Sequence, residues 1–450
     1  MINFDDLCDQ LNRTVKLSLD SGEAETLEVA MRIFQSYRLQ IVLGPDVEHD
    51  ASLQIAALTA VNCAARTFLG GVVVVGASGV LKVCLLPFSG VSDALQGLGG
   101  RIANTVDPHM PTILVGDATS EGIEPLAIRA IVDGWSGGVV RANASITGDC
   151  HHIVAPAGVL AGAIAVSEVF QRLRGNAMAC RRAIGLNLWR PEQDWRSGEQ
   201  GPTVTRLPSA AWLVGLGNLG QAYLWTLGLL PYGSDAAELV LQDFDILAPS
   251  NMSTSLLTTG DIVGLRKTRA IAAWAERRGF KTTVVERNFA ANFHINDREP
   301  SVALIGVDNA LARHSIEDAG FARVIEAGLG RGPQDYLGFN IHTFPGSAAA
   351  RTIWAEPGLT DVELTQPAYR ALLEESGDRC GTVRLAGRSI GAPFVGAAAG
   401  AMVISELLRL VMGDHHYELV TCHMRDLASR NVVHGKTWDA FNPGGVPSKE

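Results

Sequence analysis

The sequence lacks paired cysteines. Its seven cysteines stand alone along 450 residues, and no CxxC pair occurs. An odd number of scattered cysteines argues against a disulfide framework and against a cysteine-rich zinc site, and it fits a reducing compartment. Residues 1–10, MINFDDLCDQ, are acidic and show no signal-peptide pattern. We therefore expect a cytoplasmic protein.

Positive charge is also scarce. Lys and Arg number 37 against 47 Asp and Glu, which gives a formal net charge of −10. This balance argues against nucleic acid or an anionic membrane surface as the main partner, and it would suit a small protein with a basic face. Long runs without charge are missing too, because the most hydrophobic stretch, 392–410, carries Glu406 and Arg409. We expect a buried helix there and no membrane span.

The chain is long enough for two or three domains, since 450 residues exceed one ordinary hydrophobic core. Hydrophobic residues make up 47% of it, which is typical of a globular protein. The residues that suggest chemistry are concentrated between Trp212 and Lys267.

A strand, a glycine turn and a helix are predicted at the start of this stretch. The apolar run WLVGL breaks into glycines at Gly215, Gly217 and Gly220 and resumes with helical periodicity. Backbone N–H groups at such a helix N-terminus bind phosphate. A second predicted strand, 238–242, leads into Asp243, about 20 residues past the last glycine, where a dinucleotide fold places its ribose-binding acid. These features indicate a nucleotide site without separating NAD from ATP.

The residues after Asp243 form a more specific pattern. They are Asp245, Ser250, Asn251, Lys267 and, at the end of the later predicted strand VALIGVD, Asp308. With this spacing the sequence resembles the E1/ThiF/MoeB superfamily of ATP-dependent adenylating enzymes. In layout it is most similar to the E1-like proteins of bacterial ubiquitination-like (Bil-type) operons.

The resemblance implies a site for ATP and Mg²⁺. It assigns the ribose hydroxyls to Asp243, the phosphates to Asn251 and Lys267, and Mg²⁺ to Asp308. The full set of nucleotide-binding candidates is Gly215, Gly217, Asn218, Gly220, Asp243, Asn251, Lys267, Asp308 and Asn309. From the residues alone, Asp308 could instead cap a helix that starts at Asn309, and Lys267 could be a solvated helix residue.

One position departs from the family pattern. The arginine that follows Asn251 in the family falls on Thr254 here. A phosphate-binding cation is therefore expected from elsewhere, either Arg266 or an arginine of the first half such as Arg32 or Arg38. The resemblance is compatible with the second source, because E1 relatives use an arginine from the partner subunit.

The chain also repeats itself. Residues 161–173 (AGAIAVSEVFQRL) match 399–411 (AGAMVISELLRLV) at a constant offset, 399 − 161 = 238. Two α/β domains with similar terminal helices are the plain alternative, but a duplicated domain explains more. The glycine loop is not repeated. The first half has LGPDVEHD (43–50), with a proline and three acids that would repel a triphosphate.

We therefore predict an α/β protein of two doubly wound, Rossmann-like (ThiF-type) domains in a pseudo-dimer, one inactive and one active in adenylation. The predicted boundaries are 1–190 for the inactive domain, 191–208 for a linker and 209–450 for the active domain, with a short catalytic-cysteine or crossover segment at about 346–390. A homodimer contact would become a pseudo-twofold contact within one chain.

Cys380 is the candidate acceptor thiol. It lies in ESGDRCGTVRLAGRS between Arg379 and Arg384, and nearby positive charge makes thiolate available. The resemblance places the acceptor cysteine of E1-like proteins in this part of the chain. Cysteine is also a common core residue, and the others are interpreted as structural: Cys8, Cys63, Cys84, Cys150, Cys180 and Cys422.

The resemblance implies an E1-like activating enzyme. It would adenylate the C-terminus of a ubiquitin-like (β-grasp) protein with ATP and Mg²⁺ and pass it to a cysteine as a thioester, for transfer to an E2-like protein. Two alternatives stay open: an adenylating enzyme for a sulfur-carrier protein or a peptide that forms no thioester, and a non-catalytic scaffold, suggested by Thr254. An NAD oxidoreductase is disfavoured because nothing after Asp243 supports hydride chemistry.

Overall fold

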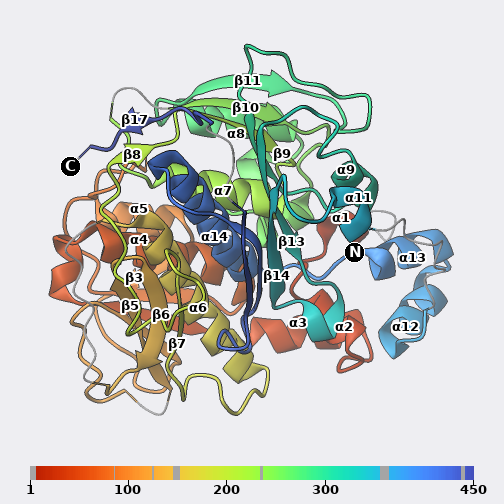
Figure 1. Cartoon of the computed structure of the whole chain (residues 1–450). Coiled ribbons are helices and arrows are strands. Elements are labelled where there is room, and N and C mark those ends of the chain that lie inside the picture. Colours follow the sequence, from red (N-terminus) through yellow and green to blue (C-terminus); the bar gives the residue numbers. More distant parts are fainter. Residues whose placement is uncertain are drawn as a thin grey trace.

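The protein contains two β-sheets, with helices packed between them and around their outer faces (Figure 1). The structure is a computed structural model, which describes residues 7–85, 87–123, 126–144, 153–233, 237–354, 364–436 and 441–449. Cys150, one of the cysteines interpreted as structural, lies outside these residues, as does part of the predicted crossover segment.

The elements of the first half precede a seven-stranded sheet or belong to it. They are α1 (Leu7–Gln10), α2 (Lys16–Asp20), α3 (Leu27–Gln35), β1 (Leu39–Leu43), η2 (Pro45–Glu48), α4 (Ala51–Thr67), β2 (Val72–Val75), α5 (Val91–Gly97), β3 (Gly100–Ala103), β4 (Thr112–Val115), β5 (Ala127–Asp133), β6 (Ser136–Arg141), α6 (Ala155–Leu173) and β7 (Ile184–Asn187). The sequence predicted one or two helices before β1, and the described residues contain three.

The second half builds an eight-stranded sheet. Its elements are β8 (Arg206–Leu207), β9 (Ala210–Val214), α7 (Asn218–Gly228), β10 (Glu238–Gln242), η3 (Pro249–Ser253), η4 (Gly260–Ile262), α8 (Lys267–Glu276), β11 (Lys281–Val285), β12 (Val302–Ile305), α9 (Ala310–His314), β13 (Arg323–Leu329), α10 (Gly332–Asp335), β14 (Gly338–Phe344), α11 (Ala350–Ile353), α12 (Pro367–Ser376), α13 (Arg379–Gly387), α14 (Pro393–Met412), β15 (Tyr417–His423), β16 (Asn431–His434) and β17 (Val446–Pro447). The short strands β8 and β17 pair with each other outside the large sheet.

The two sheets have the same topology. The first has the order β3-β2-β1-β4-β5-β6-β7 and the second β11-β10-β9-β12-β13-β14-β15-β16. In each sheet the first five strands are parallel and the following strands antiparallel. The parallel strands β1 and β2 read LQIVL and VVVV and are buried along their length, as strands covered on both faces should be. The predicted fold class is confirmed.

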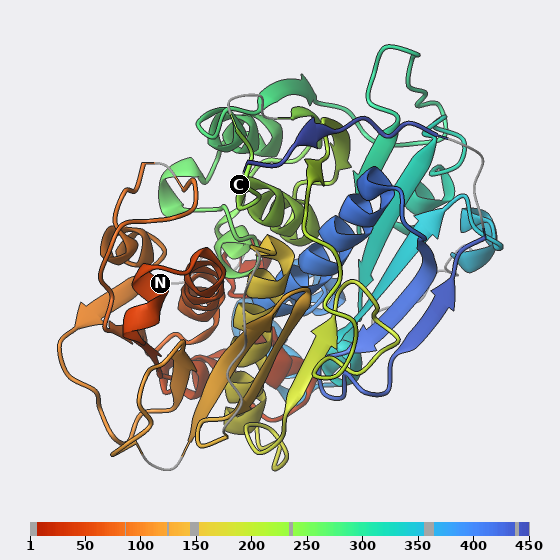
Figure 2. The same cartoon turned by 60° about the vertical axis from the view of Figure 1, so that its left-hand side comes forward.

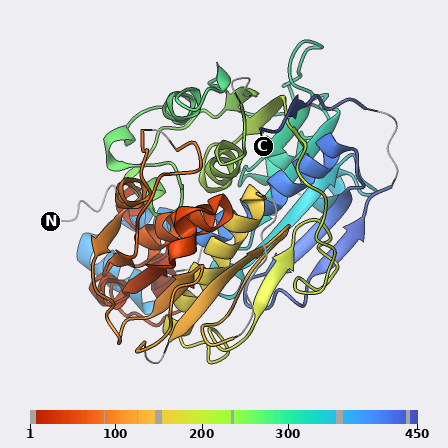
Figure 3. The same ribbon diagram turned by 90° about the vertical axis from the view of Figure 1, so that its left-hand side faces the viewer.

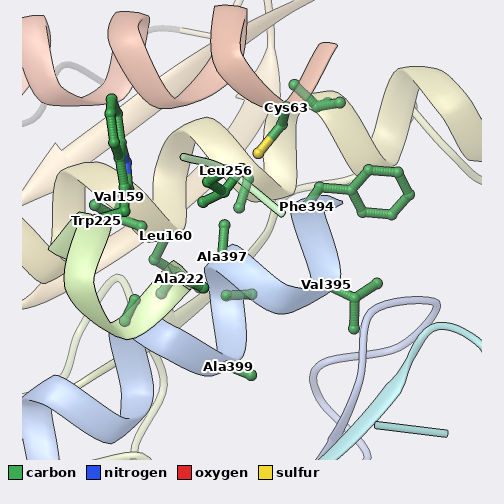
Figure 4. Packing of buried hydrophobic residues seen from close by; sticks show 14 of the residues in the cluster. Cys63, Val159, Leu160, Ala222, Trp225, Leu256, Phe394, Val395, Ala397 and Ala399 are labelled. Atoms are coloured by element: carbon green, nitrogen blue, oxygen red, sulfur yellow. The ribbon is translucent and has the colours of Figure 1, made fainter. Parts of the chain in front are cut away.

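Four helices, α4, α6, α7 and α14, pack together where the halves meet (Figures 2 and 4). Glycines permit α6 to approach α4 closely and α14 to approach α7 closely. A Cβ added at Gly162 on α6 would overlap the backbone of Ala56 on α4, and one added at Gly400 on α14 would meet the backbone of Ala222 on α7. The two glycines are 400 − 162 = 238 positions apart, the offset of the sequence repeat. The repeat therefore extends to the helix contacts at the centre of the molecule.

Each terminal helix also buries a glutamate at this offset. Glu168 on α6 accepts a hydrogen bond from the backbone N–H of Cys180 at 2.8 Å, and Glu406 on α14 accepts one from that of Tyr417 at 3.1 Å. The first contact fixes the chain shortly before β7, and the second fixes the first residue of β15. The helix α14 alone, within the described ranges, is long and apolar enough to cross a membrane, and 94% of that apolar window is buried in the protein. The buried helix expected from the sequence is present.

The segment predicted as a linker, 191–208, follows the protein surface between the two sheets (Figure 3). It is not free of contacts. The side chain of Trp195 is buried against β6, and Leu207 belongs to the small sheet formed with β17. Cys84, which the sequence analysis interpreted as structural, is an exposed thiol, whereas Cys8, Cys63, Cys180 and Cys422 are buried.

Candidate nucleotide site

Three parallel strands end together at the candidate site. They lie in the order β10-β9-β12, so the strands that follow β9 in sequence lie on opposite sides of it. Ligands of such sheets bind outside the carboxyl ends of the strands, where the order reverses. Gly215 follows β9, Asp243 follows β10, and Gly306 to Asp308 follow β12. The backbone N–H of Gly306 donates to Val214 at 2.9 Å, which holds the third loop against the first.

The glycine loop forms the sharp turn that its spacing predicted. Gly215 has φ 83°, a conformation that favours glycine. A Cβ at Gly220 would overlap the carbonyl oxygen of Gly215, whereas one at Gly217 would meet nothing within 4 Å. Gly217 is the N-cap of α7, and no side chain caps this helix. The first N–H groups of α7 therefore face open space that suits an anion.

The first half fills the equivalent place with its own carboxylates. Asp50 caps α4 and accepts hydrogen bonds from the backbone N–H groups of Ser52 at 2.7 Å and Leu53 at 3.0 Å. Asp46, in the turn before it, accepts a hydrogen bond from the backbone N–H of Asp117 at 2.9 Å. A phosphate would meet two negative charges at this helix terminus, where the N–H groups of Ser52 and Leu53 already donate to Asp50. An inactive first domain stays a prediction.

Asp243 and Lys267 lie together, as their spacing predicted. One oxygen of Asp243 accepts a hydrogen bond from the N–H of Leu216 in the glycine loop at 2.7 Å, and the other accepts one from the N–H of Asp245 at 2.9 Å. The Lys267 ammonium lies 2.7 Å from the Asp245 carboxylate and 3.8 Å from that of Asp243. The Lys267 side chain is buried, so it is not a solvated helix residue.

Two of the three candidate asparagines, Asn251 and Asn218, direct their side-chain oxygens into the protein. The side-chain oxygen of Asn251 accepts a hydrogen bond from the N–H of Ala248 at 2.8 Å and so closes the turn of η3. The side-chain oxygen of Asn218 is buried and has no hydrogen-bond partner among the described residues. It points at Gly396 of α14, where any larger residue would displace it. The bond to Ala248 leaves the amide N–H groups of Asn251 available to a ligand.

Asp308 and Asn309 have different environments. Asn309 caps α9 by accepting a hydrogen bond from the N–H of Leu311 at 2.9 Å, so the cap is Asn309 and not Asp308. The Asp308 side chain is exposed, while its backbone oxygen accepts a hydrogen bond from Arg331 at 2.7 Å. An exposed carboxylate beside the glycine loop suits Mg²⁺, which usually takes one or two carboxylates together with phosphate oxygens. Within the described ranges no group of three or more metal-binding side chains occurs.

Arg13 of the first half reaches this site, and sequence reasoning missed it. Its guanidinium donates to the Ser250 hydroxyl at 3.3 Å, and its backbone N–H donates to that of Ser253 at 3.0 Å. The Nη1 atom of Arg13 is buried and has no hydrogen-bond partner in the described part of the chain. Thr254 lies on the same turn, where the family has its arginine.

Burial is the main influence on Arg13. It lowers the pKa of the guanidinium, and the neighbouring charge of Arg388 acts in the same direction, while Cys8, Asp9 and Asp308 oppose them. A partly buried guanidinium with one unused donor is suited to an anion. Of the earlier candidates, Arg266 donates to the backbone oxygen of Phe244. Arg32 and Arg38 make no described hydrogen bond or ion pair with η3; both are exposed, and Arg38 packs beside Gly70. No sequence motif marks Arg13.

Cys380 lies apart from the crevice. It is exposed near the start of α13, which Asp378 caps through the N–H of Gly381 at 2.9 Å. The arginines of this segment face α1, with Arg384 at 3.7 Å and Arg388 at 3.6 Å from Asp9. No hydrogen bond or ion pair joins Cys380 to the glycine loop, Asp243 or Lys267 among the described contacts. The described contacts therefore join Asp243, Lys267 and the glycine loop but do not include Cys380.

Two family models match the chain, one for each half. The BilD N-terminal domain matches residues 38–188, and the BilD C-terminal domain matches residues 207–414. The chain is also similar to the bacterial E1-like protein BilD of Collimonas sp. (strain OK412). The two are 42% identical over 418 residues, which cover 91% of this chain and 90% of the relative.

Similar solved structures share far less sequence. E. coli MccB has a TM-score of 0.35 and 11% identity, over 69% of this chain and 93% of MccB. MccB with MccA-N7isoASN has a TM-score of 0.34 and 12% identity, over 69% and 95%. Selenomethionine PaaA has a TM-score of 0.33 and 14% identity, over 51% of this chain and 65% of PaaA. From the two family models and the 42% identical relative, the chain belongs to the BilD family of bacterial E1-like proteins.

Proposed function

We propose that the chain activates a carboxylate by adenylation, with ATP and Mg²⁺ bound in the crevice of the second half. The observation that supports this most is the difference between the two helix termini. Asp50 caps α4 in the first half, whereas α7 begins at Gly217 without a side-chain cap. An anion is stabilised at the open terminus and repelled at the capped one.

Each candidate residue has a role in this proposal. The glycine loop and the first turn of α7, with Asn218 and Gly220, hold phosphate, and Asp243 accepts hydrogen bonds from the ribose hydroxyls. Lys267 turns from Asp245 towards a phosphate. Asp308 binds Mg²⁺, and Asn309 fixes the position of the adjoining helix.

The positive charge missing at Thr254 comes from Arg13. The guanidinium already lies on η3, 3.3 Å from Ser250, with one nitrogen free to donate. Asn251 keeps that turn in shape through its bond to Ala248. An arginine from the first half would therefore complete a nucleotide site in the second, which gives both halves a role in one reaction.

The proposed substrate is the C-terminal carboxylate of a ubiquitin-like (β-grasp) protein. One carboxylate oxygen attacks the α-phosphorus of ATP, a bond forms between them, and the bond from the α-phosphorus to the bridging oxygen breaks with release of pyrophosphate. The carboxylate is ionised at neutral pH, so the step needs no general base. The step needs the carboxylate and the α-phosphate to be held in line and their negative charge to be neutralised. Arg13 and Lys267 supply the positive charge.

The second proposed step forms a thioester on Cys380. The thiolate sulfur attacks the acyl carbon of the adenylate, the carbon–sulfur bond forms, and the bond from that carbon to the oxygen bridging it to phosphorus breaks, so that AMP leaves with the bridging oxygen. An E2-like protein would then accept the acyl group on its own thiol. An enzyme that stops after adenylation is the second candidate, since no described hydrogen bond or ion pair joins the exposed Cys380 to the crevice residues.

Pyrophosphate exchange into ATP tests the first step. The chain is incubated with ATP, Mg²⁺ and a β-grasp protein encoded beside it, and exchange is compared in the wild type, Lys267→Met and Lys281→Met. Lys281 is an exposed lysine on β11 outside the crevice. We expect exchange to fall at least about 100-fold in Lys267→Met and to stay unchanged in Lys281→Met. Equal exchange in all three proteins would contradict the proposed site.

A further inference from the structure

A second cavity lies between the halves, outside the nucleotide crevice. Its volume is about 880 Å³, and it is lined by the end of α4, the segments near residues 85–88 and 97–99, the loop from 249 to 265 and one face of α8. Small-molecule sites in proteins are cavities of roughly 300–1,000 Å³ with mainly apolar walls and a few polar groups. This cavity has that size and construction.

Arginines are numerous in the cavity wall although the chain carries a net charge of −10. The wall includes five arginines and one acid, Asp261, and one of these arginines, Arg269, is already paired with Glu286 at 2.7 Å. The arginines are Arg66, Arg266, Arg269, Arg277 and Arg278. The rest of the wall is largely apolar and includes two indole rings, those of Trp225 and Trp274. An anion attached to an apolar body would complement both features.

Burial makes the charged form of two of these arginines less stable. Burial lowers the pKa of Arg66 to about 10 and that of Arg278 to about 10. Arg66 donates to three neutral backbone oxygens, those of Met252, Leu256 and Thr258, and takes part in no ion pair among the described residues. The Arg278 guanidinium lies 3.4 Å from the centre of the Trp274 ring.

We propose that this cavity binds a small organic anion, a carboxylate or phosphate ester attached to an aromatic or aliphatic body. The anionic group lies beside Arg277 and Arg278 at the end of α8, and the body packs on the apolar wall beside Trp274. The binding itself does not depend on the adenylation reaction. It follows from the cavity, its charge and its aromatic wall.

The same wall connects the cavity to the nucleotide crevice. Ser253 lines the cavity, and its hydroxyl accepts the hydrogen bond from the N–H of Arg13 at 3.0 Å. Arg266 lines the cavity directly before Lys267, which contacts Asp245 in the crevice. A ligand that shifts η3 or the start of α8 therefore changes the position of two proposed phosphate-binding cations. This coupling rests on the proposed function, and by linkage it acts equally in both directions.

The binding test uses 1-naphthyl phosphate as the probe and calorimetry on the full chain. Inorganic phosphate supplies the charge without the body, and 1-naphthol supplies the body without the charge. We expect one site per chain for naphthyl phosphate and binding at least about tenfold weaker for each of the two fragments. Equal affinity for inorganic phosphate or for 1-naphthol overturns the proposed ligand class.

Variants then locate the site. Arg277 and Ala273 are exposed residues that line the cavity, so Arg277→Glu reverses a charge and Ala273→Trp fills space without disturbing the core. Each should weaken the probe by about 10- to 100-fold. Arg298→Glu and Lys281→Met, at exposed residues off the cavity, should bind it like the wild type. Normal binding in both cavity variants, or its loss in both of these controls, overturns the location.

The coupling is measured separately as the affinity for ATP with and without saturating probe. We expect the two values to differ by about fivefold or more, and ATP to change the affinity for the probe by the same factor. Equal values overturn the coupling but leave the binding result intact. Loss of ATP binding in every condition would instead refute the proposed function, so the two failures are distinguishable.

Discussion

Replacing Arg13 with glutamine should remove catalysis while leaving the fold intact. In the structure the guanidinium makes one long hydrogen bond, 3.3 Å to Ser250, and has one nitrogen with no partner in the described region. The link between Arg13 and Ser253 uses the backbone N–H and survives the substitution. The side chain therefore contributes little to stability as it stands.

The expected magnitudes follow from this geometry. One long hydrogen bond contributes about 1 kcal/mol, and its loss is offset in part because a buried charge is removed with it. For a chain of this size that shifts the melting temperature by no more than about 3 °C. The loss of one charged donor to a transition state costs about 2.7–4 kcal/mol. Pyrophosphate exchange should therefore fall by about 100- to 1,000-fold.

The assay pairs exchange rates with thermal unfolding for Arg13→Gln, Arg13→Lys, Arg32→Gln and Arg38→Gln. Lysine supplies a positive charge without the planar guanidinium group, so Arg13→Lys should keep part of the activity that Arg13→Gln loses. The variants at Arg32 and Arg38 should match the wild type, since both residues are exposed away from η3. Exchange within about twofold of the wild type in Arg13→Gln would refute the role given to this residue.

Three further predictions concern the loop, a buried histidine and the thiol. Gly220→Ala should unfold at a lower temperature, because its Cβ would overlap the Gly215 carbonyl, whereas Gly217→Ala should melt like the wild type and bind ATP more weakly. Burial lowers the pKa of His416 from 6.5 to about 4. The neutral imidazole therefore contributes its full share to the free energy of unfolding above pH 6.5, and this contribution is lost as the pH drops from 6.5 towards 4, by up to about 3 kcal/mol. Denaturation across that range should show a shallower pH dependence in His416→Gln; equal slopes would contradict the assignment. Cys380→Ser should abolish a reductant-labile conjugate with the β-grasp protein and retain pyrophosphate exchange, and a labile conjugate that persists would place the acceptor thiol elsewhere.

The regular elements around the glycine loop could be predicted because their signals are local. The loop at Gly215, the strand ending before Asp243 and the buried helix around Glu406 each follow from periodicity and turn residues within a few positions. The duplication could be inferred because the repeated helices keep their small residues. Positions 162 and 400 must hold glycine for the helices to approach closely, so the small residue is visible in both copies of the repeat.

The contacts that complete the site depend on long-range packing, so no short pattern reveals them. Arg13 and Ser250 are 237 positions apart and meet only because the N-terminal segment packs across the second half. The sequence therefore suggested Arg266 or an arginine of the first half such as Arg32 or Arg38. The latter two lie in the first half, as Arg13 does, but are exposed and make no described contact with η3. The use of the Asn251 oxygen in its own turn and the cavity between α4 and α8 are also products of folding.

The central claim is that one chain holds one nucleotide, in the second half. Calorimetry with ATP and Mg²⁺ on the full chain tests this most directly. The account predicts one molecule per chain, lost in Lys267→Met and unchanged when Asp50 in the first half is replaced by Asn. Two molecules per chain, or one that remains in Lys267→Met, would contradict it.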